Sequence, residues 1–271
     1  MPELPEVETV ARDLRPLLVG RTLVGLRRSR KALRRSWSKA WEAKLVGRRV
    51  EALDRRGKWL LLGLDSGGLL MVHLGMTGRF TVVAPSAPAE DHTHLVFPLD
   101  NAHELRFRDV RRFGSITYFP DRPAWEAFLS DKLGPEPWDL SPADWHAAFR
   151  RTRRPVKAVL LDQTVIAGVG NIYADESCFA ARIDPRRPGN SLRPAEAERL
   201  LVAVREVLTR AIESRGSSIR DYVGGSGQPG GYQDEFAVYG RRGEPCPSCG
   251  KAIRCVRLAG RSTHYCGKCQ D

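Results

Sequence analysis

The stretch KWLLLGLDSGGLLMVHL, residues 58–74, indicates how the first half of the chain folds. Two apolar runs, at 58–62 and 69–73, lie on either side of the turn sequence Asp65-Ser-Gly-Gly68. Apolar runs of this length around a glycine-containing turn are typical of a β-hairpin. The sequence therefore predicts two antiparallel strands here.

A second hairpin is predicted further along. Residues 95–99 and 104–107 lie on either side of Asp100-Asn101. The apolar residues of both hairpins run consecutively rather than alternating with polar ones, which favours strands covered on both faces. We therefore expect β structure over residues 22–119, arranged as a sandwich.

Helical patterns precede and follow this β region. Residues 5–19 are predicted as a helix that begins at Pro5 and ends at Gly20. Helical pattern returns after Asp121, with Ser141 as a cap and Pro155 as a helix start. A longer amphipathic helix is expected to stop at Gly216, from the spacing of Leu200, Leu201, Val204, Val207, Leu208, Ala211 and Ile212.

Two glycine- and proline-rich segments divide the second half. Gly134-Pro-Glu-Pro137 is a rigid break, and GGSGQPGG at 224–231 is predicted to be a mobile loop. We expect a β-sandwich domain at 1–134, a helical domain at 135–240 and a small cysteine-rich domain at 241–271.

The composition restricts the kind of protein. Lys plus Arg total 44 against 32 Asp plus Glu, a net charge of +12, and 42% of residues are hydrophobic. That hydrophobic content excludes wholesale disorder. No apolar run approaches the roughly 18 residues of a membrane span, and no signal peptide is indicated, so a cytoplasmic location is expected. The charge favours nucleic-acid binding, although a merely basic solvated surface remains the alternative.

Four cysteines form two close pairs near the end of the chain. Cys246 and Cys249 are separated from Cys266 and Cys269 by sixteen residues, which is the spacing of a four-thiolate zinc ribbon. We expect one structural Zn²⁺ per chain, with two disulfides or unligated thiols as the alternative. Cys178 is predicted to be a core residue, and Cys255 a spare thiol in the ribbon.

The N-terminus contains groups suited to covalent catalysis. Removal of Met1 would leave Pro2 as the terminus, with a secondary amine. An α-amino group titrates near 8, so a neutral fraction exists at pH 7 that can attack an electrophilic carbon. Glu3 and Glu6 are candidate proton donors or positioning groups. The alternative is that Pro2 merely begins the chain and the glutamates favour a helix N-terminus.

Several ordered motifs together carry a family resemblance. They are MPELPEVET at 1–9, RRGKWLL at 55–61, LGMTGRF at 74–80, RDVRRFG at 108–114, AGVGNIYADE at 167–176, QPGGYQDEFAVYGRRGEPC at 228–246 and GRSTHYCGKC at 260–269. With these motifs the chain resembles the formamidopyrimidine-DNA glycosylases over nearly its whole length. The related endonuclease VIII type typically has glycine at the fourth position, so Leu4 favours the purine-lesion branch.

The resemblance implies a fold, a partner and an activity. The implied fold is α+β: an N-terminal helix on a β-sandwich, then a helical domain with a helix–two-turn–helix motif and a C-terminal zinc finger. DNA would bind in a basic cleft between the domains. The implied activity is that of a bifunctional glycosylase and lyase, which excises 8-oxoguanine and formamidopyrimidines from double-stranded DNA and cuts the strand by β,δ-elimination. We expect a monomer without membrane contact.

The resemblance also assigns residues. Pro2 would be the nucleophile at C1′, Glu3 the general acid and Glu6 its support, while Lys58 would assist β-elimination and Arg261 δ-elimination. Met76, Arg111 and Phe113 would fill the space left by a flipped base, with core packing as the alternative for Met76 and Phe113. The remaining implied DNA contacts are His92, Arg153, Lys157, Asn171, Tyr173 and Arg220, with Tyr222 and the loop to Tyr232 closing over the base.

Two competing functions follow from the same residues. One is the same chemistry on oxidised pyrimidines, and the other is a non-catalytic zinc-ribbon protein that binds damaged DNA. A pure binder has no use for a processed proline beside a carboxylate, so Pro2, Glu3 and Lys58 distinguish the two classes. His92 and His94 form a weak alternative metal pair because no third ligand is evident.

Overall fold

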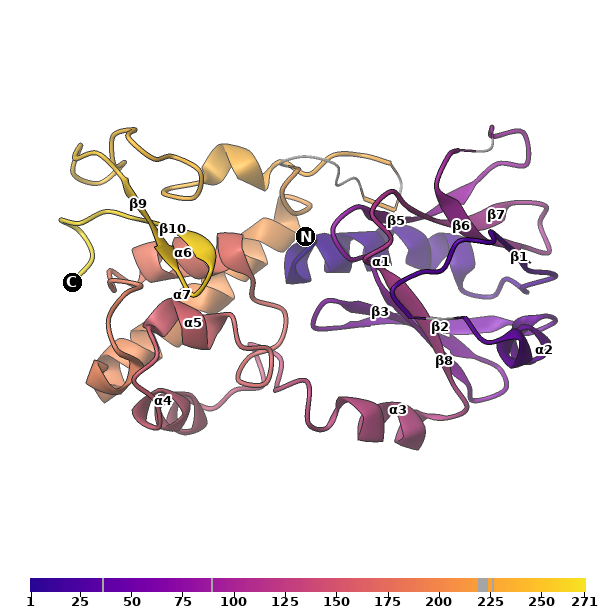
Figure 1. Ribbon diagram of the computed structural model, residues 1–271, viewed down its shortest axis with the longest axis horizontal. Coiled ribbons are helices and arrows are strands. Elements are labelled where there is room, and N and C mark those ends of the chain that lie inside the picture. The colour runs from indigo at the N-terminus through magenta and orange to yellow at the C-terminus, as the bar shows by residue number, and fades with distance from the viewer. Residues whose placement is uncertain (36, 89, 219–223, 226) are drawn as a thin grey trace. The chain divides into compact units, whose positions relative to one another are not determined.

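The computed structural model describes residues 1–35, 37–88, 90–218, 224–225 and 227–271 (Figure 1). The chain forms two compact units. Unit 1 comprises residues 1–130 and 215–230, and unit 2 comprises residues 131–214 and 231–271. Among the described residues, no helix has the length and apolar character needed to cross a membrane.

Unit 1 contains two antiparallel four-stranded sheets. The first has the order β2-β3-β4-β8, with bounds Val50–Arg56, Trp59–Leu64, Leu69–His73 and Ser115–Phe119. The second has the order β1-β6-β7-β5, with bounds Arg27–Arg28, Thr93–Pro98, Glu104–Asp109 and Gly78–Val83. Both predicted hairpins are confirmed, because β3 pairs with β4 and β6 pairs with β7.

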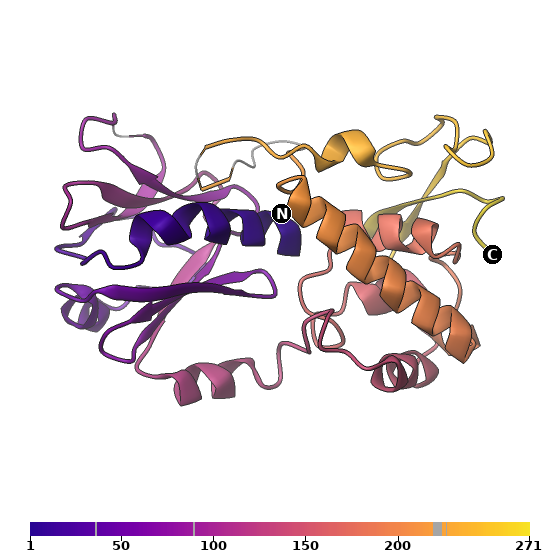
Figure 2. The same cartoon turned by 180° about the vertical axis from the view of Figure 1, so that it is seen from behind.

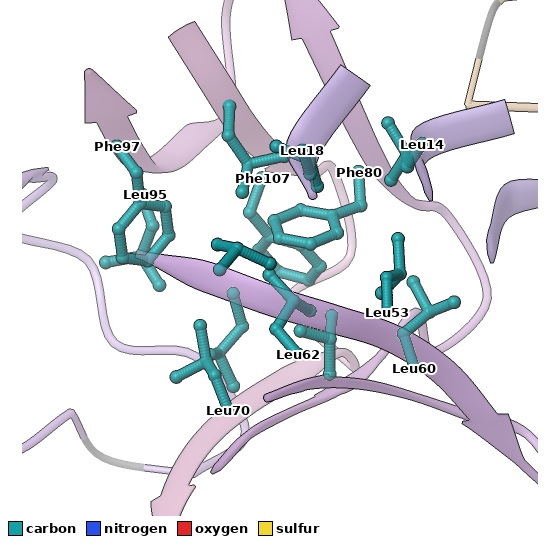
Figure 3. Close-up of a cluster of buried hydrophobic side chains, with 14 of the residues drawn as sticks. Leu14, Leu18, Leu53, Leu60, Leu62, Leu70, Phe80, Leu95, Phe97 and Phe107 are labelled. Carbon is teal, nitrogen blue, oxygen red and sulfur yellow. The ribbon is translucent and has the colours of Figure 1, made fainter. Parts of the chain in front are cut away.

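The core of unit 1 lies where helix α1 (Leu4–Leu18) and the two sheets meet. Figure 3 shows leucines and phenylalanines from α1 and from strands of both sheets directed into one cluster. Leu60 and Leu62 belong to this cluster, and Leu61, on the opposite face of β3, is buried as well, which explains the consecutive apolar run. At roughly 25 cal/mol per Å² of apolar surface, a cluster of this kind is the main stabilising contribution to the unit.

The prediction of β structure throughout residues 22–119 is wrong at one place. Residues Lys39–Trp41 form a 3-10 turn (η1), and Glu42–Leu45 form a one-turn helix, α2. Leu45 is completely buried in the core, and Trp41 packs edge-on against Trp37 at 5.3 Å between ring centroids. These few anchors hold a helical turn because the rest of the segment is polar and has no alternating pattern.

Unit 1 also contains helix α3 (Arg122–Leu129), capped by the Asp121 carboxylate, which accepts from the Ala124 amide at 2.8 Å. Unit 2 is helical except for a two-stranded sheet. Its elements are α4 (Pro142–Arg150), α5 (Val156–Leu160), α6 (Asn171–Ala180), α7 (Pro194–Glu213), the short turns η2 (Gly189–Ser191) and η3 (Tyr232–Glu235), and the strands β9 (Arg254–Leu258) and β10 (Arg261–Tyr265). Figure 2 shows α7 along its full length. The observed helix begins at Pro194, before the predicted apolar series, because proline suits a first helical turn.

Candidate functional site

The N-terminal residues of unit 1 are enclosed. Pro2 is buried, and Glu3 and Glu6 are 3% and 2% exposed. The Glu6 carboxylate accepts from the Glu3 amide at 2.8 Å, and its other oxygen accepts from the Ser217 amide at 2.8 Å. Glu6 therefore joins the start of α1 to the segment that follows α7, which is consistent with a supporting role.

The Glu6 contact also requires glycine at position 216. Gly216 has a φ of +74°, and a Cβ there would lie 2.8 Å from a Glu6 carboxylate oxygen. A second link between the same elements is the ion pair of Asp13 with Arg215 at 2.8 Å. The sequence analysis missed this anchoring because the partners are some 200 residues apart.

Lys58 lies in the turn between β2 and β3 and is 5% exposed. His73 pairs with Trp59 across β3 and β4, and the two rings are 5.3 Å apart. Burial, followed by the positive charges of Lys58, Arg34 and Arg35, lowers the pKa of His73 to about 4. His73 is therefore neutral at pH 7, mainly because it is buried and in addition because Lys58, Arg34 and Arg35 disfavour a further positive charge. The sequence analysis did not single out His73; its place opposite Trp59 in the predicted hairpin was the available signal.

Two turns of unit 1 carry Met76, Arg111 and Phe113, the residues that the resemblance assigns to filling the space left by a flipped base. Met76 and Phe113 are 39% and 43% exposed, so core packing is contradicted for both. The Arg111 guanidinium lies over the Phe113 ring, 4.5 Å from its centroid. An exposed aromatic ring with a stacked guanidinium is a suitable surface for a nucleobase.

A buried carboxylate holds these two turns together. Asp109 is completely buried and accepts from the Thr77 hydroxyl at 2.5 Å and from the Gly114 amide at 2.7 Å. The Arg111 amide donates to the Thr77 hydroxyl and to Asp109, at 3.1 and 3.2 Å. Asp109 thus fixes the backbone that carries Arg111. It was missed as a positioning residue, although it stands inside the RDVRRFG motif.

His92 and His94 have separate surroundings. His92 is exposed with a φ of +65°, and its carbonyl accepts from the Asp109 amide at 3.0 Å. His94 is buried, with Nε2 at 2.9 Å from the Asp109 carbonyl and Nδ1 at 3.0 Å from the Ser29 hydroxyl. These contacts occupy both ring nitrogens of His94, so the pair is not arranged to bind a metal.

In unit 2, Asn171 is the first residue of α6. Its side-chain amide donates to the Ser262 hydroxyl at 3.4 Å, while its Oδ1 is buried with no hydrogen-bond partner among the described residues. The start of an α-helix carries a partial positive charge from its backbone N–H groups, and a side-chain amide at that position suits a phosphate. Arg153 is exposed, as a DNA contact requires.

The side chains of Lys157 and Tyr173, two of the implied DNA contacts, are buried in unit 2. Lys157 is 1% exposed, and its Nζ lies 2.6 Å from the Asp175 carboxylate and 2.6 Å from the Ser262 carbonyl. Tyr173 is completely buried, and the centroid of its ring lies 5.7 Å from the centroid of the Tyr232 ring. Tyr232 is itself 1% exposed, so its side chain is core and does not cover a base.

Lys157 belongs to a buried network that holds strand β10 against α6. Asp175 is completely buried, and its second oxygen accepts from the His264 amide at 2.9 Å and lies 3.1 Å from His264 Nδ1. The neighbouring Glu176 accepts from the amides of residues 237–239 at 2.8–3.0 Å. Burial raises the Glu176 pKa, although these amides oppose that shift. Helix α6 thereby anchors both β10 and the segment before the cysteines.

This network gives a stability prediction. Asp175→Asn leaves Lys157 buried without a counter-charge, so we expect the unfolding free energy to fall by about 3–5 kcal/mol. Hydrogen exchange of the amides of β9 and β10, compared with those of unit 1, measures the local part of this loss. The double variant Lys157→Met/Asp175→Leu removes both charges and should recover most of the protection. Wild-type exchange in Asp175→Asn would contradict the assignment.

The four paired cysteines converge on one point in unit 2. Their sulfur atoms all lie within 4.8 Å of one another, and they are the one such group of three or more metal-binding residues among the described residues. Cys246 and Cys269 are 3.9 Å apart and Cys249 and Cys266 are 3.5 Å apart, far longer than the roughly 2.05 Å of a disulfide. The disulfide alternative is therefore contradicted.

The four sulfur atoms lie close enough to shift one another's pKa. Burial would raise the Cys266 pKa, but hydrogen bonds from the amides of residues 268 and 269 and from the Cys249 and Cys246 side chains together lower the pKa to about 7. Hydrogen bonding to Cys249 raises the Cys269 pKa to about 12. Four thiolates this close would repel one another, and a metal ion removes that repulsion. Zn²⁺ fits a closed four-sulfur site of this kind.

The other two cysteines lie apart from the cluster. Cys178 is completely buried on α6, and burial raises its pKa strongly, so its prediction as a core residue is confirmed. Cys255 lies on β9 and is a free, half-buried thiol. Arg261 is exposed at the start of β10, directly after the turn residues Ala259 and Gly260, which both have positive φ.

Arg220 and Tyr222 lie outside the described residues. The described part of the loop forms local turns, in which the Gly224 amide donates to the Gln228 carbonyl at 2.8 Å. The Gly230 amide donates to the Ser218 hydroxyl at 2.9 Å. These bonds tie the two ends of the loop to each other within unit 1.

Three segments of the chain match models of known protein families. Residues 1–116 match the formamidopyrimidine-DNA glycosylase N-terminal domain, and residues 133–223 match the H2TH domain of the same proteins. Residues 243–271 match a zinc finger found in FPG and IleRS. The chain belongs to the formamidopyrimidine-DNA glycosylase family. The predicted fold class is thus confirmed.

Individual relatives extend the match to the whole chain. The formamidopyrimidine-DNA glycosylases of Chloroflexus aurantiacus and Geobacillus kaustophilus are 46% and 45% identical to this chain over its full length, and the chain covers 98% and 100% of them. The solved MutM (Fpg) protein from Thermus thermophilus is 44% identical, with a TM-score of 0.88 and coverage of 99% of this chain and 98% of that one. Lactococcus lactis Fpg, solved in complex with DNA containing an abasic site, is 34% identical with a TM-score of 0.91 and 99% coverage of both chains.

In this member of the formamidopyrimidine-DNA glycosylase family, the residues of the sequence motifs lie on several elements of both units. In unit 1 the structure places Pro2, Glu3 and Glu6 at the start of α1 and Lys58 in the β2–β3 turn, on elements that pack against each other. In unit 2 it brings Asn171 close to Ser262, the neighbour of Arg261.

Proposed function

We propose that this protein is a DNA glycosylase and AP lyase that removes 8-oxoguanine and formamidopyrimidines from double-stranded DNA. The observation that carries the proposal is the enclosed N-terminus, where buried Pro2 and Glu3 precede a helix within a glycosylase family fold. A protein that only binds DNA has no need of a buried glutamate beside a terminal proline. The exposed Met76, Arg111 and Phe113 support action on an extrahelical base.

Pro2 would act as the nucleophile once Met1 has been removed. Its neutral secondary amine attacks C1′ of the damaged nucleotide, and the bond from C1′ to the base breaks. The departing base takes the bonding electron pair and the proton that the Pro2 nitrogen gives up when it bonds to C1′. Opening of the sugar ring then gives an iminium between Pro2 and C1′, in which the positive nitrogen withdraws electrons from the sugar.

Glu3 and Lys58 would handle the protons of these steps. Glu3, 3% exposed, protonates the ring oxygen of the sugar as the ring opens. With the iminium in place, loss of a proton from C2′ expels the 3′ phosphate in β-elimination, and Lys58 assists this step. Arg261 grips phosphates and assists the second, δ-elimination, which expels the 5′ phosphate. The product is a one-nucleotide gap with a phosphate on each end.

The remaining residues would hold the DNA in a flipped state. A base inside a duplex must leave the stack before its sugar can be attacked. Met76 and Phe113 would fill the space, and Arg111 would donate to the base left without a partner. Asn171 at the start of α6, with His92, Arg153 and Arg220, would contact the backbone. The Lys157 and Tyr173 side chains are instead assigned to positioning in unit 2.

Three further properties complete the proposal. The metal in the cysteine cluster is Zn²⁺, supported by the four-sulfur donor set. The chain divides into domains at 1–134, 135–240 and 241–271. The protein acts as a monomer. A cytoplasmic location is supported by the lack of disulfide bonds among the six cysteines, all of which are among the described residues.

Borohydride trapping tests this function. Borohydride reduces an iminium to a stable amine, so a duplex with one 8-oxoguanine opposite cytosine should give a covalent complex that maps to Pro2. Glu3→Gln should lower the rate of covalent trapping by about 10²-fold or more, since ring opening precedes the iminium and a positioned general acid contributes that much. Glu8→Gln is the matched control, because Glu8 lies on the same helix in ion pairs with Arg12 and Arg55 and should retain turnover.

The competing functions give different results in the same assay. Trapping only on an oxidised-pyrimidine duplex would move the chain to the other specificity. Tight binding without trapping on either duplex, by protein that lacks Met1, would identify a damage-binding protein.

A further inference from the structure

A hollow of about 560 Å³ opens in unit 1 beside the turn that carries Arg111. One wall is the segment that follows β1, and the other is the turn after β7. The Arg112 guanidinium donates to the Ala32 carbonyl at 3.4 Å and so connects the two walls. The lining residues are Ala32, Leu33, Arg34, Arg111, Arg112 and Phe113.

The hollow is strongly positive. Three of its lining residues are arginines and none is acidic. Arg34, Arg111 and Arg112 form no ion pair with a carboxylate in the described part of the chain, and the bond from Arg112 to a carbonyl leaves its charge uncompensated. The charge of Arg34 reaches beyond the hollow, since it contributes to the lowered pKa of His73. An anion would therefore be attracted to this surface.

The hollow also has an apolar and aromatic side. Phe113 is 43% exposed, with the Arg111 guanidinium over one face of its ring. Leu33 is half-buried on the opposite wall. A guanidinium fork recognises phosphate oxygens through paired hydrogen bonds, and aromatic or guanidinium planes stack on bases. Phosphate and base recognition side by side is what a nucleotide requires.

We propose that this hollow holds a nucleotide of the complementary strand, with Arg34 bound to its phosphate. The inference rests on the proposed function, in which Arg111 faces the base left opposite the lesion. Arg111 and Arg34 line the same hollow, so the phosphate that Arg34 reaches belongs to the strand of that base. The segment Ala32–Arg34 is thus a second contact surface for this strand, in addition to Arg111 and Phe113.

A double-mutant cycle between protein and DNA tests the contact. The ligand is a duplex with a tetrahydrofuran abasic analogue in the lesion strand, which the enzyme cannot process. Single phosphates of the complementary strand are replaced in turn by uncharged methylphosphonates, and Kd is measured at several salt concentrations. We expect Arg34→Ala to weaken binding about 10-fold and to reduce the salt slope by about 1, as for one lost phosphate contact.

The double-mutant cycle also identifies which phosphate of the complementary strand Arg34 contacts. One methylphosphonate near the orphan base should weaken wild-type binding about as much as Arg34→Ala does, and the two changes together should cost no more than either alone. Arg34→Lys should retain part of the affinity, because lysine keeps the charge but not the fork. Arg48→Ala removes an exposed arginine outside the hollow, and its effect should add to that of every methylphosphonate.

Other outcomes would overturn the inference. These are wild-type affinity in Arg34→Ala, strict additivity with every complementary phosphate, or coupling to a phosphate of the lesion strand. The proposed function is checked separately, by borohydride trapping of wild-type protein on the 8-oxoguanine duplex. If wild type traps but Arg34 shows no coupling, this contact fails while the function stands. If wild-type protein gives no covalent complex, the proposed glycosylase and lyase function is wrong, and the inference that rests on it falls with it.

Discussion

A form of the protein with any residue preceding Pro2 should lose turnover by at least about 10³-fold, as enzymes do when their nucleophile is removed. In such a chain the Pro2 nitrogen is part of a tertiary amide. Its lone pair is delocalised into the carbonyl, so it can neither attack C1′ nor form an iminium. The side chains of Glu3, Glu6 and Lys58 are all retained, which separates loss of the nucleophile from loss of the surrounding site.

The experiment compares one preparation before and after proteolysis. A short N-terminal extension ending in a protease site directly before Pro2 is added, and base release and borohydride trapping are measured on the 8-oxoguanine duplex. Removal of the extension should restore both, and intact mass confirms that Pro2 is the terminus. An extended protein that turns over at the wild-type rate, or a processed protein that never recovers, would exclude Pro2 as the nucleophile. Binding to an abasic-analogue duplex controls for obstruction by the extension.

The features that could be predicted from sequence are those with local signals. The hairpin of β3 and β4 follows from two apolar runs around one turn, and α1 from apolar spacing after Pro5. The cysteine cluster follows from two close pairs, because such pairs bring four sulfurs together with little loop cost. In each case the residues that decide the structure lie within a few positions of each other, or carry a ligand chemistry that leaves few alternatives.

Lys157 shows why the rest could not be predicted. A lysine in a basic chain, fourteen positions before Asn171, suggests a phosphate contact. Its partners are Asp175 in α6 and the Ser262 carbonyl, which is 105 residues away. Only tertiary structure shows that the charge is compensated inside unit 2. Asp109 is similar, because its contacts with Thr77 and Gly114 depend on how two turns of different strands meet.

Removal of the metal should unfold the segment that carries Arg261. The buried core around the cysteines is small, with Val238, Cys246, Ile253 and Cys266 as its buried members. The sheet of this segment has two strands, β9 and β10, and a two-stranded sheet is marginally stable at best in water. Metal binding to segments of this kind contributes about 10–16 kcal/mol of apparent folding free energy. The contacts that Lys157 and Asp175 make with β10 are too few to replace the folding free energy that metal binding contributes.

We therefore expect a chelator to abolish hydrogen-exchange protection over 254–265 while the sheets of unit 1 keep theirs. DNA affinity should fall because Arg261 loses its place, and added Zn²⁺ should restore both protection and binding. Elemental analysis should give one zinc per chain, lost in Cys249→Ser but retained in Cys255→Ser, since Cys255 lies outside the cluster. If β9 and β10 stay protected without metal, the α6 network rather than the cysteine cluster holds Arg261 in position. The Asp175→Asn variant should then show the larger loss.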